Sequence, residues 1–371
     1  MSVLLNLPKI LFDFDAVINL PSELEILNVK RPFFITDRNL RECGVFEKAV
    51  IALPQEAKFP IFDEIPENPT VEGVEKAYYL YAEKMCDGIV AVGGGSVIDS
   101  AKMVAFRSGH SAPISQYEQH PEMITDNTAP LITIPTTAGT GSEVTFGAGV
   151  HPDPQKPSMN FGSPNLMPDI AICDPELTMT LPESLTASTG MDAFGQCIEA
   201  YLARGNNPVI DAVVLDGAKR AYENIQKAVR DGDDKEARWN MMMAALEGGI
   251  GIHKGLGSAH SIANSLGDQG FNHGLLVTIA LPAVLRFLEN SIAERINSLR
   301  MHIGLEDKRD LASMVEQLNK CIGIPGDLKD LGYQMKDIPD KAELCHGSIF
   351  NMTAPIIPSN DQYRKLLEDI S

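Results

Sequence analysis

Three consecutive glycines follow a short apolar run and precede a helical pattern. Residues 88–92 are largely apolar, then come Gly93, Gly94, Gly95 and Ser96. Glycine lets backbone N–H groups crowd around a phosphate, and the N-terminus of a following helix adds a favourable field. The motif points to a nucleotide cofactor, although a plain strand-to-helix turn would have the same composition. Its spacing also differs from the usual dinucleotide fingerprint, in which other residues separate the glycines.

One carboxylate and two histidines in the second half of the chain have the chemistry of metal ligands. Asp192 and Gln196 are one helical turn apart and share a face. His260 and His273 follow in two further segments. A carboxylate and two imidazoles on helices that face one cleft suit a divalent transition metal. Each could instead be a hydrogen-bonded helix residue, and the spacing of the two histidines is not a metal signature by itself.

Hydroxyl groups and glycines are concentrated in the segment between these two motifs. Thr136, Thr137, Thr140 and Ser142 come shortly after an apolar run at 131–134. Small donors at the end of a strand can hold phosphate or ribose oxygens. The alternative is a surface loop built from turn-forming residues.

The first half of the chain alternates between strand and helix patterns. Short apolar runs predict strands, and amphipathic spacing predicts helices between them. This alternation predicts a Rossmann-like α/β domain with a mostly parallel sheet covered on both faces. The predicted strands are 32–36, 49–53, 88–92, 131–134 and 170–173, and the predicted helices include 71–85 and 97–108.

The second half of the chain has a helical pattern. From residue 184 onward strand-like alternation is nearly absent, and Pro208 opens one helix in a favourable first-turn position. We place the boundary near residue 181, which gives an α/β domain at 1–181 and an all-α domain at 182–371. The predicted helices are 192–202, 209–229, 236–250, 259–266 and 275–288.

The composition is that of a globular protein with a strongly acidic balance. The chain has 371 residues, enough for two domains, and a formal net charge of −19. This charge argues against nucleic-acid partners and against docking on anionic membranes. Residues 1–20 lack the basic start and apolar core of a signal peptide, and no run is long enough to span a membrane. The six cysteines form no CxxC pair, so we expect a cytoplasmic protein with reduced thiols.

Four motifs, in this order, resemble the iron-containing (group III) alcohol dehydrogenase family, whose fold is shared by dehydroquinate synthase. The match runs from about residue 30 to residue 285. The resemblance implies an α/β domain and a helical domain with a dinucleotide bound in the cleft between them. The motifs are Gly93-Gly94-Gly95-Ser96-x-x-Asp99, the run from Pro135 to Glu143, Asp174-Pro175-x-Leu177 and Gly190-Met191-Asp192-Ala193.

The resemblance also implies which residues contact the cofactor. Gly94, Gly95 and Ser96 would face the pyrophosphate, with Asp99 nearby. Asp37 matches the position that meets the adenosine ribose. A carboxylate there accepts hydrogen bonds from free ribose hydroxyls and repels a 2′-phosphate, so we expect NAD rather than NADP. The second cofactor loop matches Thr136, Thr137, Thr140 and Ser142, and Lys156 matches a family lysine near the ribose.

Asp192, His260 and His273 match three of the family's four metal ligands. At the fourth position, where the family has histidine, this chain has Gln196. An amide oxygen can still ligate, but it is a weaker donor than imidazole. Because zinc tolerates mixed nitrogen and oxygen ligands and stands higher in the affinity order, we expect a divalent metal, with zinc favoured over iron.

Two further positions bear on proton transfer. The family often has a second histidine four residues after His260, close to the nicotinamide, where this chain has Asn264. An amide cannot shuttle protons near neutral pH, so we expect a different proton route. His253 lies seven residues before His260. It could substitute for a missing imidazole, or it could cap or pack a helix.

The activity implied by the resemblance is metal-assisted interconversion of an alcohol and an aldehyde or ketone. Family members act on short alcohols, diols, hydroxy acids and sugar acids. The unusual Gln196 and Asn264 point to a specialised branch, such as the one that oxidises the terminal hydroxyl of the sugar acid 3-deoxy-manno-octulosonate (Kdo). The alternatives are a lyase of the dehydroquinate synthase type and a non-catalytic NAD-binding protein. Homodimers are common in the family, so we expect one here.

Overall fold

The computed structural model describes residues 5–54, 58–153, 156, 158–305 and 310–371. Within it the chain divides into two compact units. The α/β unit comprises Asn6–Thr137 and Ser142–Thr180, and the helical unit includes Ala138–Gly141 and Leu181–Ser371. Residues 138–141 therefore belong to the helical unit, although the residues before and after them belong to the α/β unit. The sequence does not predict this interruption.

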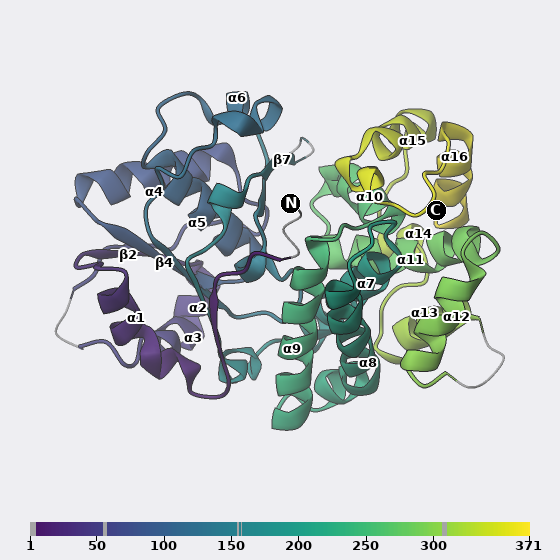
Figure 1. Ribbon diagram of the computed structural model, residues 1–371, viewed down its shortest axis with the longest axis horizontal. Coiled ribbons are helices and arrows are strands. Elements are labelled where there is room, and N and C mark those ends of the chain that lie inside the picture. The colour runs from purple at the N-terminus through teal and green to yellow at the C-terminus, as the bar shows by residue number, and fades with distance from the viewer. Residues whose placement is uncertain (1–4, 55–57, 154–155, 157, 306–309) are drawn as a thin grey trace. The chain divides into compact units, whose positions relative to one another are not determined.

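A six-stranded parallel sheet forms the centre of the α/β unit (Figure 1). Its strand order is β1-β8-β5-β4-β2-β3, and every neighbouring pair is parallel. A separate antiparallel hairpin is formed by β6 (Gly147–Val150) and β7 (Met159–Gly162). The six strands of the main sheet are β1 (Lys9–Phe12), β2 (Pro32–Ile35), β3 (Ile61–Phe62), β4 (Gly88–Gly93), β5 (Leu131–Pro135) and β8 (Ile170–Cys173).

Successive side chains of the strands pack on opposite faces of this sheet. Phe33 and Ile35 of β2 belong to one apolar cluster, and Phe34 belongs to another. In Figure 1, α4 and α5 lie on one side of β2 and β4, and α1 and α3 lie on the other. The prediction of a parallel sheet covered on both faces is confirmed. The helices of this unit are α1 (Leu20–Ile26), α2 (Arg38–Glu42), α3 (Val45–Ala49), α4 (Val71–Glu83), α5 (Gly95–Arg107) and α6 (Ile114–Gln119), with short 3-10 turns η1 (Ala16–Asn19), η2 (Pro121–Met123), η3 (Ser142–Val144), η4 (Pro164–Leu166) and η5 (Pro175–Thr178).

The predicted strand at 49–53 is wrong. The chain there completes helix α3 and continues as a turn, and the edge strand of the sheet is β3. Val45, Phe46 and Ala49 are buried at helical spacing, so this apolar run is the buried side of a short helix. An apolar run of this length fits a helix end as well as a strand, and periodicity alone cannot separate the two. The two edge strands of the sheet, β1 and β3, and the β6–β7 hairpin have no counterpart among the predicted strands.

The chain reverses its direction of winding between β2 and β4. From β2 it moves outward to β3, and it then crosses to β4 on the opposite side of β2. In doubly wound sheets, ligands bind outside the carboxyl ends of the strands at such a reversal. Asp37, which follows β2, and Gly94, which follows β4, therefore lie where a nucleotide is expected.

Helix α7 (Glu183–Leu202) is the central element of the helical unit. It packs against α8, α9 and α11 (Figure 1). Helix α8 begins at Pro208, as predicted, and the side chain of Asn207 caps it by accepting from the N–H of Ile210. All five predicted helices are present, and α7 begins earlier than predicted, directly after Pro182. The other helices are α8 (Pro208–Arg230), α9 (Lys235–Ile252), α10 (Ser258–Ser265), α11 (His273–Glu289), α12 (Ala293–His302), α13 (Leu311–Cys321), α14 (Leu328–Leu331), α15 (Ile338–Gly347) and α16 (Asn360–Asp369), with 3-10 turns η6 (Gly267–Gln269) and η7 (Ile349–Met352).

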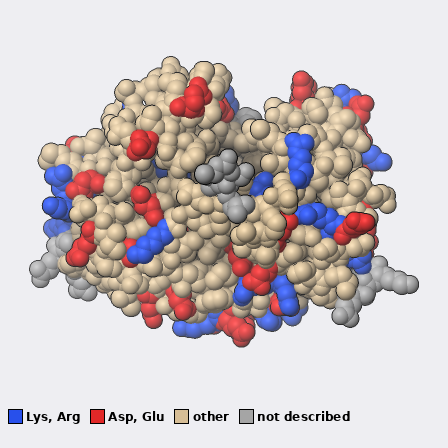
Figure 2. All heavy atoms as spheres, viewed as in Figure 1, with Lys and Arg blue, Asp and Glu red and all other residues tan. Residues whose placement is uncertain are grey.

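The surface carries charges of both signs. On the face seen in Figure 2, acidic and basic side chains are interspersed, and the acidic excess does not gather in one patch. Among the described residues, no helix is both long enough and apolar enough to cross a membrane.

Candidate metal centre and cofactor site

Helix α7 carries three polar side chains on one buried face. Asp192, Gln196 and Glu199 follow one another along the same side of the helix, because they are spaced by four and three residues. Their exposed fractions are 2%, 3% and 4%. Burying polar groups costs free energy unless they have hydrogen-bond or metal partners, so we expect these three side chains to have such partners.

Two histidines from other helices meet Asp192. The Nε2 atom of His260 on α10 lies 3.6 Å from Oδ1 of Asp192. The ring of His260 lies 5.6 Å, centroid to centroid, from that of His273, the first residue of α11. One potential ligand atom from each of the three residues lies within 4.8 Å of the others. The structure therefore brings together Asp192, His260 and His273, which are three of the four residues predicted as metal ligands; the fourth is Gln196.

The facing atoms of this cluster have no hydrogen-bond partner within the described part of the chain. Oδ1 of Asp192 and Nε2 of His260 are both buried and both unpartnered. Two such buried atoms would be costly if nothing bound them, because buried polar groups are almost always satisfied. Two imidazoles and one carboxylate form a donor set that suits a divalent transition metal. The cluster thus fits the predicted metal on its own geometry.

The surroundings of the two histidines shift their pKa values in opposite directions. Burial acts to lower the pKa of His260, but the nearby carboxylates of Asp192 and Glu199 outweigh burial and raise the pKa to about 9. Desolvation lowers the pKa of His273, although part of this residue is exposed, and the nearby His260 lowers it further. In the metal-free protein His260 therefore holds its proton through neutral pH.

Sequence reasoning missed Glu199, although its position seven residues after Asp192 on one helix would have placed it on the same face.

The amide of Gln196 is oriented by two acceptors. Its Nε2 donates to the carbonyl oxygen of Thr140 at 3.2 Å and to Oδ2 of Asp192 at 3.3 Å. Its Oε1 is buried and, within the described residues, has no hydrogen-bond partner. In this orientation the amide nitrogen, and not the amide oxygen, faces the Asp192 carboxylate.

Asn264 and His253 lie on two neighbouring segments of the helical unit. Asn264 is half-buried on α10, one turn after His260. His253 is half-buried at the C-terminal end of α9, where its N–H donates to the carbonyl of Ile250. The group of metal-ligating side chains found among the described residues does not include His253.

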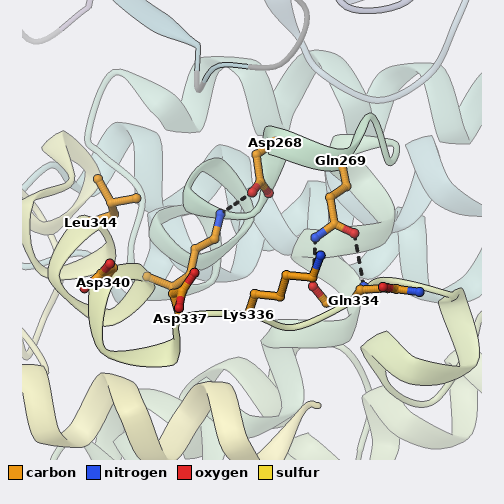
Figure 3. Close-up of a pocket in the computed structure, with 8 residues that line it drawn as sticks. Asp268, Gln269, Gln334, Lys336, Asp337, Asp340 and Leu344 are labelled. Carbon is orange, nitrogen blue, oxygen red and sulfur yellow. Dashed lines mark hydrogen bonds and ion pairs between the residues drawn. The ribbon is translucent and has the colours of Figure 1, made fainter.

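The segment that joins α10 to α11 is tied to a later part of the chain. Gln269 and Gln334 exchange two hydrogen bonds, at 2.9 Å and 3.1 Å. Asp268 accepts from the hydroxyl of Tyr333 at 2.9 Å and pairs with Nζ of Lys341 at 2.7 Å. Asp268, Gln269 and Gln334 line an open hollow of about 490 Å³. Figure 3 shows these three residues in its wall. These contacts hold in place the segment that lies between the two histidines.

In the α/β unit, the glycine turn joins β4 to α5. Gly94 is the N-cap of α5 and Gly95 its first residue, so the turn presents the N-terminus of a long helix. A Cβ atom on Gly94 would lie 3.2 Å from the side chain of Thr137, so the turn and the second predicted cofactor loop are packed together. The Ser96 hydroxyl donates to the carbonyl oxygen of Glu67. A backbone cradle of this kind suits a pyrophosphate.

Asp99 and Ser142 are bonded to each other. Oδ1 of Asp99 accepts from the Ser142 hydroxyl at 2.5 Å, and Oδ2 accepts from the N–H of Gly149 at 2.8 Å. The buried Lys102, which sequence reasoning missed, donates to the Ser142 hydroxyl at 2.9 Å and to the Gly147 carbonyl at 2.6 Å. Desolvation lowers the pKa of Lys102 to about 8, although Asp99 opposes this. The network fixes α5 to the loop that follows β5.

The other predicted cofactor residues lie on several elements. Asp37 is half-buried after β2, and its Oδ1 caps α2 by accepting from the N–H of Leu40 at 3.0 Å. Thr136 is buried, and its N–H donates to the carbonyl of Gly93 at 3.1 Å. Thr140 belongs to the helical unit. Lys156 is exposed between β6 and β7, where Nζ pairs with Asp153 at 2.9 Å.

Comparison with known proteins identifies the family. The profile described as "Iron-containing alcohol dehydrogenase" matches residues 8–175, and that of the family's C-terminal domain matches residues 186–371. The chain belongs to the iron-containing alcohol dehydrogenase family. A 4-hydroxybutyrate dehydrogenase of Cupriavidus necator is 41% identical over 99% of both chains.

Solved structures of this alcohol dehydrogenase family have the same fold. A 1,3-propanediol oxidoreductase superposes with a TM-score of 0.93 at 28% identity and covers 100% of both chains. A sulfoacetaldehyde reductase of Bifidobacterium kashiwanohense, in complex with NAD+, superposes with a TM-score of 0.90 at 26% identity, covering 100% of this chain and 99% of the other. The prediction of an α/β domain followed by a helical domain of the dehydroquinate synthase type is confirmed.

The family assignment settles the general class of activity. This chain is an oxidoreductase of the alcohol dehydrogenase type that acts on CH–OH groups. The family uses a divalent metal, usually iron, together with NAD. The relatives named above are dehydrogenases and reductases, so neither a lyase nor a non-catalytic protein gains support. Nothing in these comparisons favours zinc over iron.

Proposed function

We propose that this chain is an NAD-dependent dehydrogenase of a short ω-hydroxy carboxylate, which interconverts 4-hydroxybutyrate or a close analogue and the corresponding aldehyde. The cluster of Asp192, His260 and His273, in which the first two residues are buried, supports a metal-dependent dehydrogenase. We infer the substrate class from one observation, the 41% identity to a 4-hydroxybutyrate dehydrogenase over 99% of both chains.

We propose that Asp192, His260 and His273 hold an iron(II) ion. Two imidazoles and one carboxylate with open positions are the ligand set of many non-haem iron(II) sites. When bound, such an ion supplies Lewis acidity to an alcohol or carbonyl oxygen, and the nicotinamide supplies the hydride chemistry. The preference for zinc rested on an amide oxygen as fourth ligand, and the hydrogen bonds of Gln196 favour a different role for that residue.

The residues around the three ligands position them. The N–H of the Gln196 amide donates to Oδ2 of Asp192, so Oδ1 is left to face His260. Phe350 packs against the ring of His260 at 5.8 Å, centroid to centroid, and gives this side of the site an aromatic wall. Asn264, one turn further along α10, cannot carry a proton near neutral pH. The proton that leaves the alcohol must therefore pass by another route.

The glycine turn and Asp37 would bind NAD. The backbone at Gly94 and Gly95 opens a helix whose N-terminus favours the pyrophosphate. Asp37 follows β2 beside the winding reversal and would accept from the adenosine ribose. Ser142 and Asp99 would act by holding the neighbouring loop, because each already bonds the other.

The decisive experiment is a substrate panel with the purified, iron-loaded protein under anaerobic conditions. NADH formation is followed with 4-hydroxybutyrate, 1-butanol, 1,3-propanediol and the sugar acid Kdo, each with NAD and with NADP. We expect the highest kcat/KM for 4-hydroxybutyrate with NAD. A higher value for Kdo would replace the substrate proposal, and no turnover of any of these compounds would refute it.

Two controls accompany this panel. Asp192→Asn keeps the size of the side chain but removes the charge of the ligand, so bound metal and turnover should fall together. Elemental analysis of protein purified without chelators tests iron against zinc. Light scattering of the same preparation tests the expected homodimer.

A further inference from the structure

Glu199 is a buried carboxylate that belongs neither to the predicted ligands nor to the cofactor residues. It lies on α7, seven residues after Asp192, and both of its oxygens are engaged by the start of α10. Oε1 accepts from the N–H of Ala259 at 2.8 Å. Oε2 accepts from the N–H of His260 at 3.3 Å and is 2.5 Å from Nδ1 of the same residue.

One role of Glu199 is to cap α10 from another helix. The first N–H groups of a helix have no partner within that helix. The N-cap of α10 is Gly257, which has no side chain to serve them. A Cβ atom on Gly257 would lie 2.7 Å from Oε1 of Glu199, so this glycine leaves the space that the carboxylate occupies. The cap is thus supplied by α7, the helix that also carries Asp192.

The same carboxylate decides which nitrogen of His260 is available. An ionised carboxylate only accepts hydrogen bonds, so Nδ1 of His260 must be the donor in this pair. In the neutral ring Nε2 then carries the lone pair. This Nε2 is buried, has no hydrogen-bond partner among the residues that the structure describes, and lies 3.6 Å from Oδ1 of Asp192. Glu199 therefore aims the lone pair of His260 at the metal cluster.

We propose that Glu199 is a positioning residue of the metal centre. It fixes the tautomer and the ring orientation of His260, and its negative charge makes Nε2 a stronger donor. Carboxylates that accept the second N–H of a ligating histidine act in this way on bound metals. The proposal rests on the metal-binding part of the proposed function and is independent of the substrate.

The test compares metal affinity in Glu199→Gln and in the wild-type protein. Dissociation constants for Co²⁺ and, anaerobically, for Fe²⁺ are measured by competition with a chelator, and the Co²⁺ absorption spectrum reports ligand geometry. The amide oxygen of this variant can still accept from the N–H of Ala259, but the amide lacks the charge that holds the Nδ1–H tautomer. We expect the affinity of the variant to fall by about 10- to 100-fold and the Co²⁺ spectrum to change.

The matched control is Asp310→Asn in the same helical unit. Asp310 caps α13 by accepting from the N–H and hydroxyl of Ser313 at 2.7 Å and 2.8 Å, and it does not belong to the metal cluster. This variant should lose a comparable amount of thermal stability and bind both metals as the wild type does. A fall in metal affinity equal to that of Glu199→Gln would show a general effect of weakened caps and overturn the proposal.

A second variant keeps the test decisive if Glu199→Gln does not fold. Gly257→Ala retains the charge but pushes the Glu199 carboxylate away from α10, so it should also weaken metal binding. Wild-type affinity and an unchanged Co²⁺ spectrum in a folded Glu199→Gln, or in Gly257→Ala, would show that Glu199 is only a cap. A wild-type protein that binds neither ion would overturn both this inference and the proposed function. Loss of turnover on the substrate panel alone would leave the inference standing.

Discussion

Gly274 of α11 packs so closely against α7 that a Cβ atom on it would lie 3.1 Å from the Cβ of Asp192 and 2.5 Å from the carbonyl oxygen of Ser188. No side chain fits at this position without moving one of the two helices. Because Gly274 directly follows His273, the close approach of the helices sets the distance between the carboxylate and the second imidazole.

Gly274→Ala should therefore damage the metal centre and the fold together. The added methyl group must push the start of α11 away from α7, at a cost of about 1–3 kcal/mol in the free energy of unfolding. His273 moves with it, so the metal dissociation constant should rise. Chelator competition and urea unfolding measure the two effects. The control is Gly267→Ala, where an added Cβ meets nothing within 4 Å. Unchanged metal binding in Gly274→Ala would contradict the argument.

Asp37→Asn should shift the cofactor preference toward NADP. The amide keeps an oxygen that can cap α2, as Oδ1 of Asp37 does through the N–H of Leu40. It removes the charge that repels a 2′-phosphate, and one such contact near a surface is worth on the order of 1 kcal/mol or more. We expect the ratio of kcat/KM for NADP to that for NAD to rise roughly tenfold. A ratio that stays at the wild-type value would exclude Asp37 from the ribose site.

The sequence predicts most elements of the fold because their apolar patterns are unambiguous. Five segments with helical apolar spacing become helices of the helical unit, and four of the five predicted strands are present. The failure at 49–53 has a local cause, since Val45, Phe46 and Ala49 form the buried side of a short helix. The hairpin of β6 and β7 was not predictable because three of its eight residues are glycine, which gives no strand pattern.

The three side chains of the candidate metal cluster can be picked out from the sequence, but the contacts that support them cannot. Asp192, His260 and His273 stand out because their side chains bind metals. Glu199 and Lys102 do not, because each resembles an ordinary charged residue of a helix until its partners are known. Those partners are distant in sequence: Glu199 bonds residues of α10, and Lys102 bonds Ser142. Contacts of this kind follow from packing between elements, which spacing along one chain does not encode.

Gln196→His should tighten metal binding. Gln196 lies one turn after Asp192 on α7, so an imidazole there is placed to act as a fourth ligand. Imidazole is a better donor than an amide for iron and zinc, and we expect the dissociation constants for both to fall severalfold. Gln196→Ala is the matched variant, and it should weaken binding because Asp192 loses the hydrogen bond from Nε2. Equal affinities in Gln196→His and the wild type would contradict this prediction.

Glu247 on α9 should make the stability of the helical unit fall as the pH rises. Burial is the main reason why its pKa is raised to about 8, the nearby Asp216 adds to the rise, and Arg220 opposes it. The unfolded chain releases this proton near the ordinary value of 4.5, so between the two values only the folded state holds it. The stabilisation from this proton is complete when the pH is below the pKa of the unfolded chain. It is lost as the pH rises through the pKa of the folded protein.

Glu247→Gln removes this dependence, because the amide keeps the shape of the side chain without a titrating group. Each unit between the two pKa values is worth about 1.4 kcal/mol at most. The free energy of unfolding of the variant minus that of the wild type should therefore rise by on the order of 2 kcal/mol from about pH 5 to pH 8. Urea unfolding at the two pH values measures the gain. Glu236→Gln, at an exposed position near the start of α9, is the control and should show no such gain. If the difference between Glu247→Gln and the wild type is the same at both pH values, Glu247 does not bind its proton more tightly in the folded state than in the unfolded chain.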